Sequence, residues 1–587
     1  MIGSLRELFS HVSRRRRQLG PVLMLMLAGA VAEVVSLGAI LPFLAVVSKP
    51  QEALASERLR PLLDVLGLNT PMELVIAAAV GFALSAVIAA AVRLLLVWGS
   101  QKFVFAVAHE LSVAVYRRTL HQPYAYHTAH NSSETLAAIN KAQLVTNGLL
   151  VPLMQAASAA IIALFILLGL LFVDPLVALV SGFGFGVIYL LVMHFTKRMM
   201  RRNGGVIARA QKERVQAAGE GLGGIRDVLL DRSQMVFVKR FSAVESDLRR
   251  TQGTNNFVAA APRFVVEGLG LVLIAGLALM LSLRDGGLVG AIPVLGALAL
   301  GAQRLLPLLQ QLYTGWTSYM ANGQSLRDVL DILRLPDAPQ FAASQNVEPL
   351  PFNTAIALEN VRFSYPAVSR PAIEEVNLVI SKGMRVGFVG KTGSGKSTLM
   401  DIVLGLLTPT GGRILIDGVE LSDANRSAWQ ARIAHVPQAI YLSDGSIAEN
   451  IAFGVSSEKI DHARVHRAAE QAELLDVIEA LPQGYGSIVG ERGIRLSGGQ
   501  RQRIGIARAL YKQADVLVFD EATSALDNET ERAVMQAIDG LSRALTVILI
   551  AHRISTLAKC DYIFELNAGK VSLRVDDVLQ QTNNRTG

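Results

Sequence analysis

The strongest constraint on this chain is a set of long apolar stretches in its first half. A helix needs about 20 mostly apolar residues to cross the hydrocarbon core of a bilayer. Stretches of that kind are Gly20–Val47, Met72–Trp98, Gly148–Val173, Leu176–Phe195, Phe257–Leu283 and Leu288–Tyr313. The sequence therefore predicts a multi-pass α-helical membrane domain with six transmembrane helices. The basic run before the first stretch is also typical of a cleaved signal peptide, but that stretch is too long and five more follow, which favours an uncleaved anchor.

Composition supports a membrane protein. The chain has 587 residues, of which 51% are hydrophobic and 18% charged, whereas soluble domains carry about 25% charged residues. This excludes a single soluble enzyme, a disordered chain and a small disulfide scaffold, since Cys560 is the one cysteine and an intrachain disulfide needs two. The net charge is +8, yet no aromatic and basic pattern of a nucleic-acid module occurs. We therefore expect a bilayer partner and no nucleic acid.

The connections between the stretches predict the topology. Asp174-Pro175 joins the third and fourth stretches, and 284–287 joins the fifth and sixth. The connections from the second to the third stretch and from the fourth to the fifth are about 50 to 60 residues long, enough for helices that reach about 30–40 Å beyond the bilayer. Their basic residues include Arg117, Arg118, Lys197, Arg198, Arg201, Arg202, Arg209, Lys212 and Arg214, and the N-terminus adds Arg14–Arg17. The positive-inside rule places the N-terminus, both long connections and the C-terminal domain in the cytoplasm. We expect the membrane to be the inner membrane of the cell.

Two shorter segments have amphipathic patterns. Leu5, Leu8, Phe9 and Val12 follow helical spacing beside basic residues, which predicts a short interfacial helix. Gln51–Leu68 carries leucines that are compatible with an amphipathic helix on the opposite side of the membrane or with a solvated loop.

The Pro-containing stretches near residues 335–341 and 348–351 indicate a linker. The predicted domains are therefore 1–330 (transmembrane), 331–353 (linker) and 354–587 (an α/β nucleotide-binding domain).

The second half carries a phosphate-binding loop. Gly390–Thr398 matches GxxxxGK[ST], follows the apolar strand pattern Arg385–Val389 and precedes a helix-like run, which is the context this motif needs. Backbone N–H groups at a helix N-terminus attract phosphate anions. Lys396 is expected to pair with the β- and γ-phosphates and Ser397 to bind Mg²⁺. The residues expected to hold nucleotide are Gly390, Lys391, Thr392, Gly393, Ser394, Gly395, Lys396, Ser397 and Thr398.

A second apolar strand pattern, Val516–Glu521, ends in two carboxylates. Such an ending by itself is common at a strand end. After a phosphate-binding loop it predicts that Asp520 binds the metal and that Glu521 orients or deprotonates the attacking water.

The pentapeptide Leu496–Gln500 is the signature of the ATP-binding cassette (ABC) superfamily, which the sequence resembles over nearly its whole length. The resemblance implies ATP and Mg²⁺ as cofactors, an ATP hydrolase coupled to transport, and the roles of the remaining residues. Gln438 resembles the glutamine that contacts the metal and couples it to the membrane helices, His552 the histidine at the γ-phosphate, and Tyr365 the aromatic that stacks on adenine. Ser524–Asp527 resembles the D-loop. The signature residues Ser497, Gly498, Gly499 and Gln500 bind ATP held by another copy.

One cassette and six spans in one chain resemble a half-transporter of the exporter type, with the type IV ABC exporter fold. Gly490–Gly493 is similar to a loop of exporter-type members. The resemblance implies a second chain, as a homodimer or a heterodimer. The turns near Pro123–Ser133 and Gly221–Asp231 would then be the coupling helices.

Few charged residues lie within the apolar stretches, and charge in a span indicates function by default. Apart from Glu73 at the start of the second stretch, they are Glu33, Arg93, Arg263, Glu267 and Arg304. Arg263 and Glu267 are also placed to pair along one helix, and Arg93 to snorkel to the interface. The surplus of arginine suits a phosphate group. We predict a cargo cavity that contains Arg93, Arg263 and Arg304.

The stretches Glu33–Phe43, Arg304–Pro307 and Ile440–Gly454 resemble the bacterial flippases for lipid-linked oligosaccharides. The resemblance implies ATP-driven flipping of a phosphate-bearing lipid-linked oligosaccharide across the inner membrane. The alternatives are an exporter of lipid A-like lipids or drugs and, less in keeping with an intact Glu521, an ABC channel or regulator.

Overall fold

A computed structural model describes residues 2–48, 50–56, 67–130, 132–173, 175–282, 287–336, 350–366, 370–521, 531–532, 540, 544–551 and 557–574. The chain forms two compact units. The helical unit comprises Met1–Gln122 and His130–Asp337, and the cassette comprises Pro123–Ala129 and Ala338–Gly587. Each unit is described by itself below.

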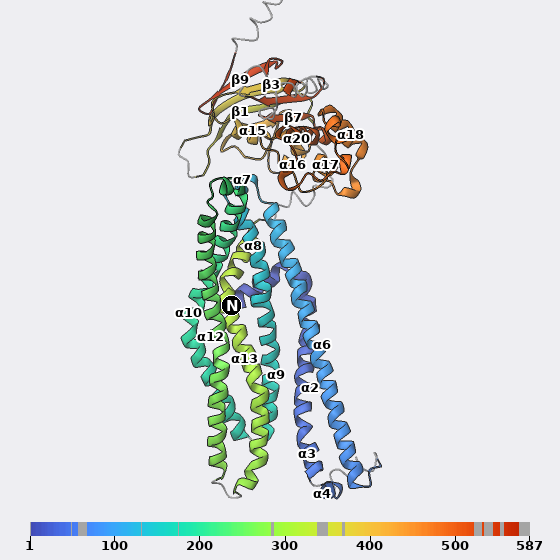
Figure 1. Ribbon diagram of the computed structural model, residues 1–587, viewed down its shortest axis with the longest axis vertical. Coiled ribbons are helices and arrows are strands. Elements are labelled where there is room, and N and C mark those ends of the chain that lie inside the picture. Colours follow the sequence, from blue (N-terminus) through green and yellow to red (C-terminus); the bar gives the residue numbers. More distant parts are fainter. Residues whose placement is uncertain are drawn as a thin grey trace, which may run out of the picture. The chain divides into compact units, whose positions relative to one another are not determined.

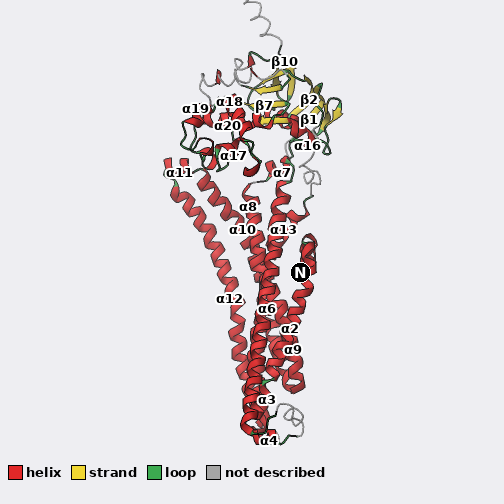
Figure 2. Ribbon diagram, turned by 90° about the vertical axis from the view of Figure 1, so that its right-hand side faces the viewer, coloured by secondary structure: helices red, strands yellow, loops and turns green. Residues whose placement is uncertain are grey.

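The helical unit consists of long helices packed along their lengths (Figures 1 and 2). Its elements are α1 (Ile2–His11), η1 (Ser13–Gln18), α2 (Leu19–Gly38), α3 (Ile40–Ser48), α4 (Pro50–Leu54), α6 (Pro71–Leu120), α8 (Ser132–Val145), η2 (Thr146–Leu150), α9 (Val151–Val173), α10 (Pro175–Gly223), α11 (Ile225–Leu230), α12 (Gln234–Ser282) and α13 (Gly287–Arg334). Figure 1 shows α2 beside α6, both in blue, with α9 and α10 in teal and α12 and α13 in green to yellow-green.

Three described helical segments are long and apolar enough to cross a membrane. They are Arg15–Ser36, Pro71–Leu120 and Ala137–Gly169, and they contain most of the first three predicted spans. The other three predicted spans lie in α10, α12 and α13, where part of each apolar stretch has side chains outside the description. For those, membrane crossing stays a prediction. Of the predicted segment Gln51–Leu68, α4 covers the start, and residues 57–66 lie outside the described part.

The long connections are continued helix, as the sequence predicts. Helix α6 starts at a capping box, in which Thr70 and Glu73 each accept from the other's backbone N–H, and continues past the apolar span to Leu120. The short helix α11 occupies the second predicted coupling turn. The first such turn contains α7 (Tyr124–Ala129), which belongs to the cassette unit. Helix α13 runs to Arg334, so the predicted linker begins as helix, because Leu330 and Leu333 are still buried in the bundle.

The N-terminal helix α1 is present, but its apolar face packs into the protein. Leu8 and Val12 are buried in a core with Val107 and Leu111 of α6, and the ring of Phe9 stacks on Phe103 at 6.4 Å. The apolar face of α1 therefore packs into the helical bundle, and the interfacial position of the helix stays a prediction. A neighbouring helix offers the same apolar surroundings as the lipid interface, and the pattern alone does not distinguish them.

Helix α12 contains a proline, Pro262, whose missing N–H leaves the carbonyl of Val258 without its helical donor. The hydroxyl of Tyr313 in α13 donates to that carbonyl at 3.1 Å. The side-chain amide of Gln310, one turn earlier in α13, donates to the carbonyl of Ala259 at 2.8 Å. The bond from Tyr313 satisfies a backbone carbonyl that lipid would leave unpaired, and both bonds join α12 to α13.

The cassette is an α/β unit. Besides α7, its elements are β1 (Ala355–Phe363), β2 (Ile373–Ser381), β3 (Arg385–Val389), α15 (Lys396–Val403), β4 (Gly411–Ile416), β5 (Val419–Glu420), α16 (Arg426–Arg432), β6 (Ile433–Val436), α17 (Ile447–Ile451), η4 (Ser457–Lys459), α18 (His462–Gln471), α19 (Leu475–Glu479), η5 (Gly484–Gly486), η6 (Glu491–Gly493), α20 (Gly498–Lys512), β7 (Val516–Asp520), β8 (Thr546–Ile550), β9 (Tyr562–Asn567) and β10 (Lys570–Leu573). Helices α17, α18 and α20 gather on one side of it and the strands on the other (Figure 2).

Within the described residues, the strands form an antiparallel sheet in the order β2-β1-β4-β5 and a second sheet in the order β10-β9-β3-β8-β7-β6. Strands β9, β3, β8, β7 and β6 of the second sheet run parallel. Side chains of β7 alternate between two cores: Val516 and Val518 pack with α15, and Leu517 and Phe519 pack with α17 and α20. Because both faces are covered, the central strands are apolar throughout.

Candidate functional sites

The phosphate-binding loop lies between β3 and α15. Gly395, at the N-cap of α15, has φ +105°, a conformation that side chains other than glycine rarely adopt. A Cβ atom on Gly395 would also meet the carbonyl oxygen of Ala372 at 2.6 Å. The loop therefore requires glycine for its conformation and for its close approach to the neighbouring chain.

Lys396 is buried, and its ammonium group donates to the carbonyls of Gly390 at 2.8 Å and Lys391 at 3.2 Å. The lysine thus lies across its own loop, where phosphates would displace these carbonyl contacts. Ser397 is exposed at the first turn of α15, so its hydroxyl is accessible to a metal ion. Ser394 is buried, and its Oγ has no hydrogen-bond partner among the described residues. This orphaned hydroxyl and the buried cation suit a bound phosphate.

Asp520 and Glu521 lie at the carboxyl end of β7, two strands from β3 in the parallel sheet. Glu521 has φ +49°, and its backbone N–H donates to the carbonyl of Ile550 at 3.0 Å. The side-chain amide of Gln438 donates to a carboxylate oxygen of Glu521 at 2.7 Å. The structure thus brings Gln438 and Glu521 together, although 83 residues separate them.

Asp401 is a further acidic residue of this site, which the sequence analysis did not single out. Burial, and next the negative charge of Asp520, raise the pKa of Asp401 to about 6. Asp401 lies four residues after Ser397 in α15 and so shares its helix face. That spacing was the signal in the sequence.

Tyr365 follows β1, and its ring meets Phe363 edge-on at 5.0 Å between centroids. The hydroxyl of Tyr365 is 3.1 Å from Oγ1 of Thr398. This bond holds the partly exposed ring beside the phosphate-binding loop.

Tyr124 of α7 has a raised pKa, because of burial first and then the charges of Asp401 and Tyr365.

The signature peptide starts α20. Ser497 is the N-cap: its Oγ accepts from the backbone N–H of Gln500 at 3.2 Å, and the Gln500 side chain accepts from the Ser497 N–H at 2.9 Å. Gly498 and Gly499 form the first turn and leave their N–H groups facing outward from the helix start.

His552 and Ser524–Asp527 lie outside the described residues, so their assigned roles stay predictions.

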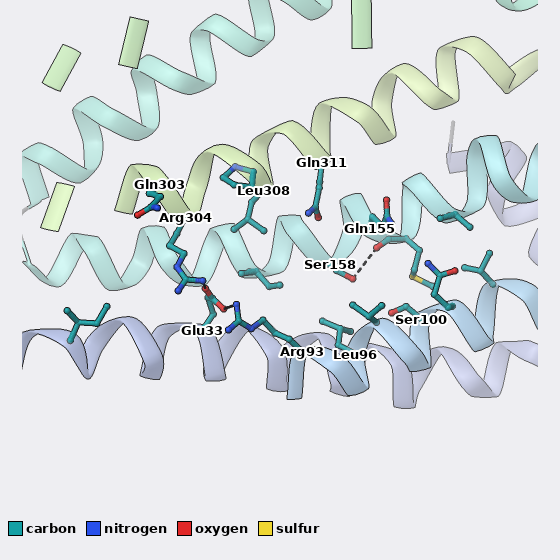
Figure 3. A pocket seen from close by; sticks show the side chains of 18 residues that line it. Glu33, Arg93, Leu96, Ser100, Gln155, Ser158, Gln303, Arg304, Leu308 and Gln311 are labelled. Atoms are coloured by element: carbon teal, nitrogen blue, oxygen red, sulfur yellow. Dashed lines mark hydrogen bonds and ion pairs between the residues drawn. The ribbon is translucent and has the colours of Figure 1, made fainter. Parts of the chain in front are cut away.

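The helical unit contains a cavity of about 620 Å³ between α2, α6, α9 and α13. Its polar lining residues are Glu33, Arg93, Ser100, Gln101, Gln155, Ser158, Gln303, Arg304 and Gln311. Figure 3 shows Glu33 between Arg93 and Arg304. One carboxylate oxygen of Glu33 is 2.8 Å from Nη1 of Arg304, and the other is 3.2 Å from Nη1 of Arg93.

The three predicted cargo arginines do not lie together. Arg93 and Arg304 line the cavity. Arg263 is exposed on α12 and pairs with Glu267 at 2.8 Å one turn away, as the alternative interpretation of that spacing expects. Arg263 does not line this cavity, and its part in cargo binding stays a prediction. The sequence analysis counted Glu33 among the intramembrane charges but did not predict that it joins two arginines.

The comparisons with known proteins address both units. The family model described as the ABC transporter transmembrane region matches residues 22–285, and the ABC transporter model matches residues 373–524. The ATP-dependent lipid A-core flippase of Burkholderia orbicola is 31% identical over 483 residues, which cover 79% of this chain and 77% of that protein. The lipid A-core flippase of Alkalilimnicola ehrlichii is 32% identical over 397 residues. That match covers 66% of this chain and 65% of the relative, just under two thirds of its length.

The fold as a whole matches a solved structure described as a bacterial Atm1-family ABC exporter with ATP bound. The TM-score is 0.77, with 24% sequence identity over 97% of this chain and 96% of that one. The likeness establishes the fold, a helical N-terminal part followed by an α/β domain, as the sequence predicts.

Proposed function

The chain belongs to the ABC transporter family, as a half-transporter with one membrane domain and one ATPase domain, and we propose that it exports an anionic, phosphate-bearing glycolipid. In this proposal the chain works as a homodimer in the inner membrane, with the cassette in the cytoplasm. Each signature peptide then caps ATP on the phosphate-binding loop of the other copy. ATP hydrolysis at two such sites drives alternating access of the cargo cavity.

The observation that carries the cargo proposal is the pair of cavity arginines. Arg93 and Arg304 are 39% and 40% exposed at their side chains, while Glu33 is 7% exposed. The two guanidinium groups are therefore more accessible than the carboxylate between them, and all three groups line the cavity. Two arginines and one glutamate leave one net positive charge, and guanidinium groups bind phosphate oxygens in a two-pronged geometry.

Two glycolipid classes share this phosphate chemistry. The curated relatives are lipid A-core flippases, which favours a lipid A-like cargo. The sequence motifs around Glu33 and Arg304 favour a polyprenyl-diphosphate-linked oligosaccharide. Both carry an anionic phosphate beside sugar hydroxyls, and the amides of Gln155, Gln303 and Gln311 on the cavity wall suit those hydroxyls.

The residues around the phosphate-binding loop fit ATP and Mg²⁺. Lys396 would contact the phosphates, while Ser397, Asp520 and Gln438 would hold the metal. When bound, Mg²⁺ neutralises the charge that develops on the transferring phosphoryl group. Glu521, held by the Gln438 amide, accepts a proton from the attacking water. We also assign His552 to the γ-phosphate.

The test is transport in proteoliposomes with labelled lipid A in one arm and a labelled polyprenyl-diphosphate oligosaccharide in the other. We expect ATP-dependent movement of at least one cargo, absent in Glu521→Gln and reduced at least tenfold in Arg304→Gln, because the variant removes the net positive charge. Movement of lipid A alone selects the first class, and movement of the oligosaccharide alone selects the second. Unchanged transport in Arg304→Gln would contradict the cavity as the cargo site.

A further inference from the structure

The cavity contains the carboxylate of Glu33, although a site that binds anions is expected to carry positive charge only. Glu33 comes from α2, Arg93 from α6 and Arg304 from α13 (Figure 3). Glu33 is 5% exposed overall, and each of its oxygens serves a different arginine. A buried carboxylate within hydrogen-bond distance of both guanidinium groups competes with any phosphate for their N–H donors.

The arginines retain donors for a ligand. A guanidinium group has five N–H donors. Among the described residues, Arg304 bonds Glu33 through Nη1, and Arg93 bonds Glu33 through Nη1 and the carbonyl of Ala89 through Nε at 3.4 Å. The remaining donors are available to the cavity, and Glu33 lowers the net charge that faces a ligand from +2 to +1.

We propose that Glu33 is a built-in counter-ion that weakens phosphate binding by Arg93 and Arg304 and so sets cargo release. The inference rests on the anionic cargo proposed above. An unopposed pair of arginines in a low-dielectric cavity would hold a phosphate too tightly to release it. The carboxylate repels the phosphate that the arginines bind through their remaining donors, and this repulsion favours release of the cargo. Transport needs binding that is strong enough to load the cargo and weak enough to unload it. In this proposal Glu33 sets the affinity between those limits.

The obvious alternative is that Glu33 only stabilises the helix packing through its two ion pairs. The two roles predict opposite effects for Glu33→Gln. If Glu33 only fixes the arginines in place, the variant loosens them and weakens phosphate binding. If it is a counter-ion, the variant removes one negative charge a few ångströms from the phosphate, and binding tightens by about tenfold or more.

The experiment measures equilibrium binding of radiolabelled farnesyl diphosphate to the full-length protein in nanodiscs without nucleotide, with farnesol as the uncharged comparison. We expect Glu33→Gln to lower the Kd for farnesyl diphosphate at least about tenfold and to slow cargo turnover at saturation. The matched control is Glu110→Gln. Glu110 also accepts from an arginine, Arg15 at 2.7 Å, but lies on α6 outside the cavity lining, so its Kd should stay unchanged.

A second pair of variants removes the dependence on how well Glu33→Gln folds. Arg304→Gln leaves Arg93 and Glu33 with no net charge, and binding should weaken at least about tenfold. Adding Glu33→Gln to Arg304→Gln restores a net charge of +1, and binding should return to within a few-fold of wild type. If the wild type binds the diphosphate but Glu33→Gln leaves the Kd equal or raises it, in the wild-type or the Arg304→Gln background, that result overturns the counter-ion role alone. Equal binding of farnesol and farnesyl diphosphate by the wild type overturns the anionic cargo itself.

Discussion

The phosphate-binding loop of the cassette gathers consecutive residues, Gly390–Thr398, between one strand and one helix, whereas the charged cluster of the helical unit joins Glu33, Arg93 and Arg304 from three helices. In the first site backbone geometry makes the binding surface, so that glycines and the helix start define it. In the second site side chains make the surface, and helix packing decides which of them meet. Local sequence therefore predicts a site of the first kind, and sites of the second kind need the tertiary structure.

Of the predicted effects, we expect the largest to be the loss of ATP turnover on substitution of Glu521 in the cassette site. Glu521→Gln should lower ATP turnover by about 10²–10⁴-fold, because an amide does not accept the proton of the attacking water, and it should leave ATP binding intact. Steady-state phosphate release and a nucleotide-binding assay on the purified protein check both parts. Glu565→Gln is the control, since Glu565 is exposed on β9. Turnover above a tenth of wild type in Glu521→Gln would contradict the assigned role.

A smaller effect is expected where backbone geometry is altered. Gly395→Ala should raise the Kd for ATP by roughly tenfold or more, because the new Cβ is strained at φ +105° and meets the carbonyl oxygen of Ala372. Gly418→Ala is the matched control: Gly418 also has a left-handed conformation, φ +81°, but open space around it. Titration with a fluorescent ATP analogue measures both. Similar Kd values for the two variants would break the claim that close approach shapes the loop.

The smallest effect is expected in the helical unit, at the proline of α12. Tyr313→Phe removes the hydroxyl that donates to the carbonyl of Val258, and the free energy of unfolding should fall by about 1 kcal/mol. Thermal unfolding in detergent measures this as a lower midpoint. Tyr319→Phe on the same helix is the control, because the described residues offer its hydroxyl no partner. An equal or smaller shift in Tyr313→Phe than in the control would contradict the bond's contribution.

The sequence predicted the cassette site in more detail than the helical site. Lys396 lies at the start of α15, and Asp520, Glu521 and Gln438 follow strands of the parallel sheet, as their motifs predict. Asp401 was not singled out although it lies four residues after Ser397, and its raised pKa depends on burial and on Asp520, which come from the fold.

In the helical unit, the charges were recognised, and the spacing of four residues also indicated the pair of Arg263 and Glu267. The partner of Arg304 was not predicted, because Glu33 lies on another helix, far away in the sequence. Likewise the apolar face of α1 suits a lipid interface as well as a protein core, and packing selected the core.

The sequence by itself determined the membrane and cassette organisation, the family, and the nucleotide chemistry, because apolar length, backbone conformation and strand ends are local properties. Only the tertiary structure decided that Glu33 lies between Arg93 and Arg304, that Tyr313 and Gln310 donate to carbonyls near Pro262, and that the apolar face of α1 packs into the helical bundle. Those outcomes depend on which helix faces meet, and helix packing is set by contacts between residues far apart in the chain.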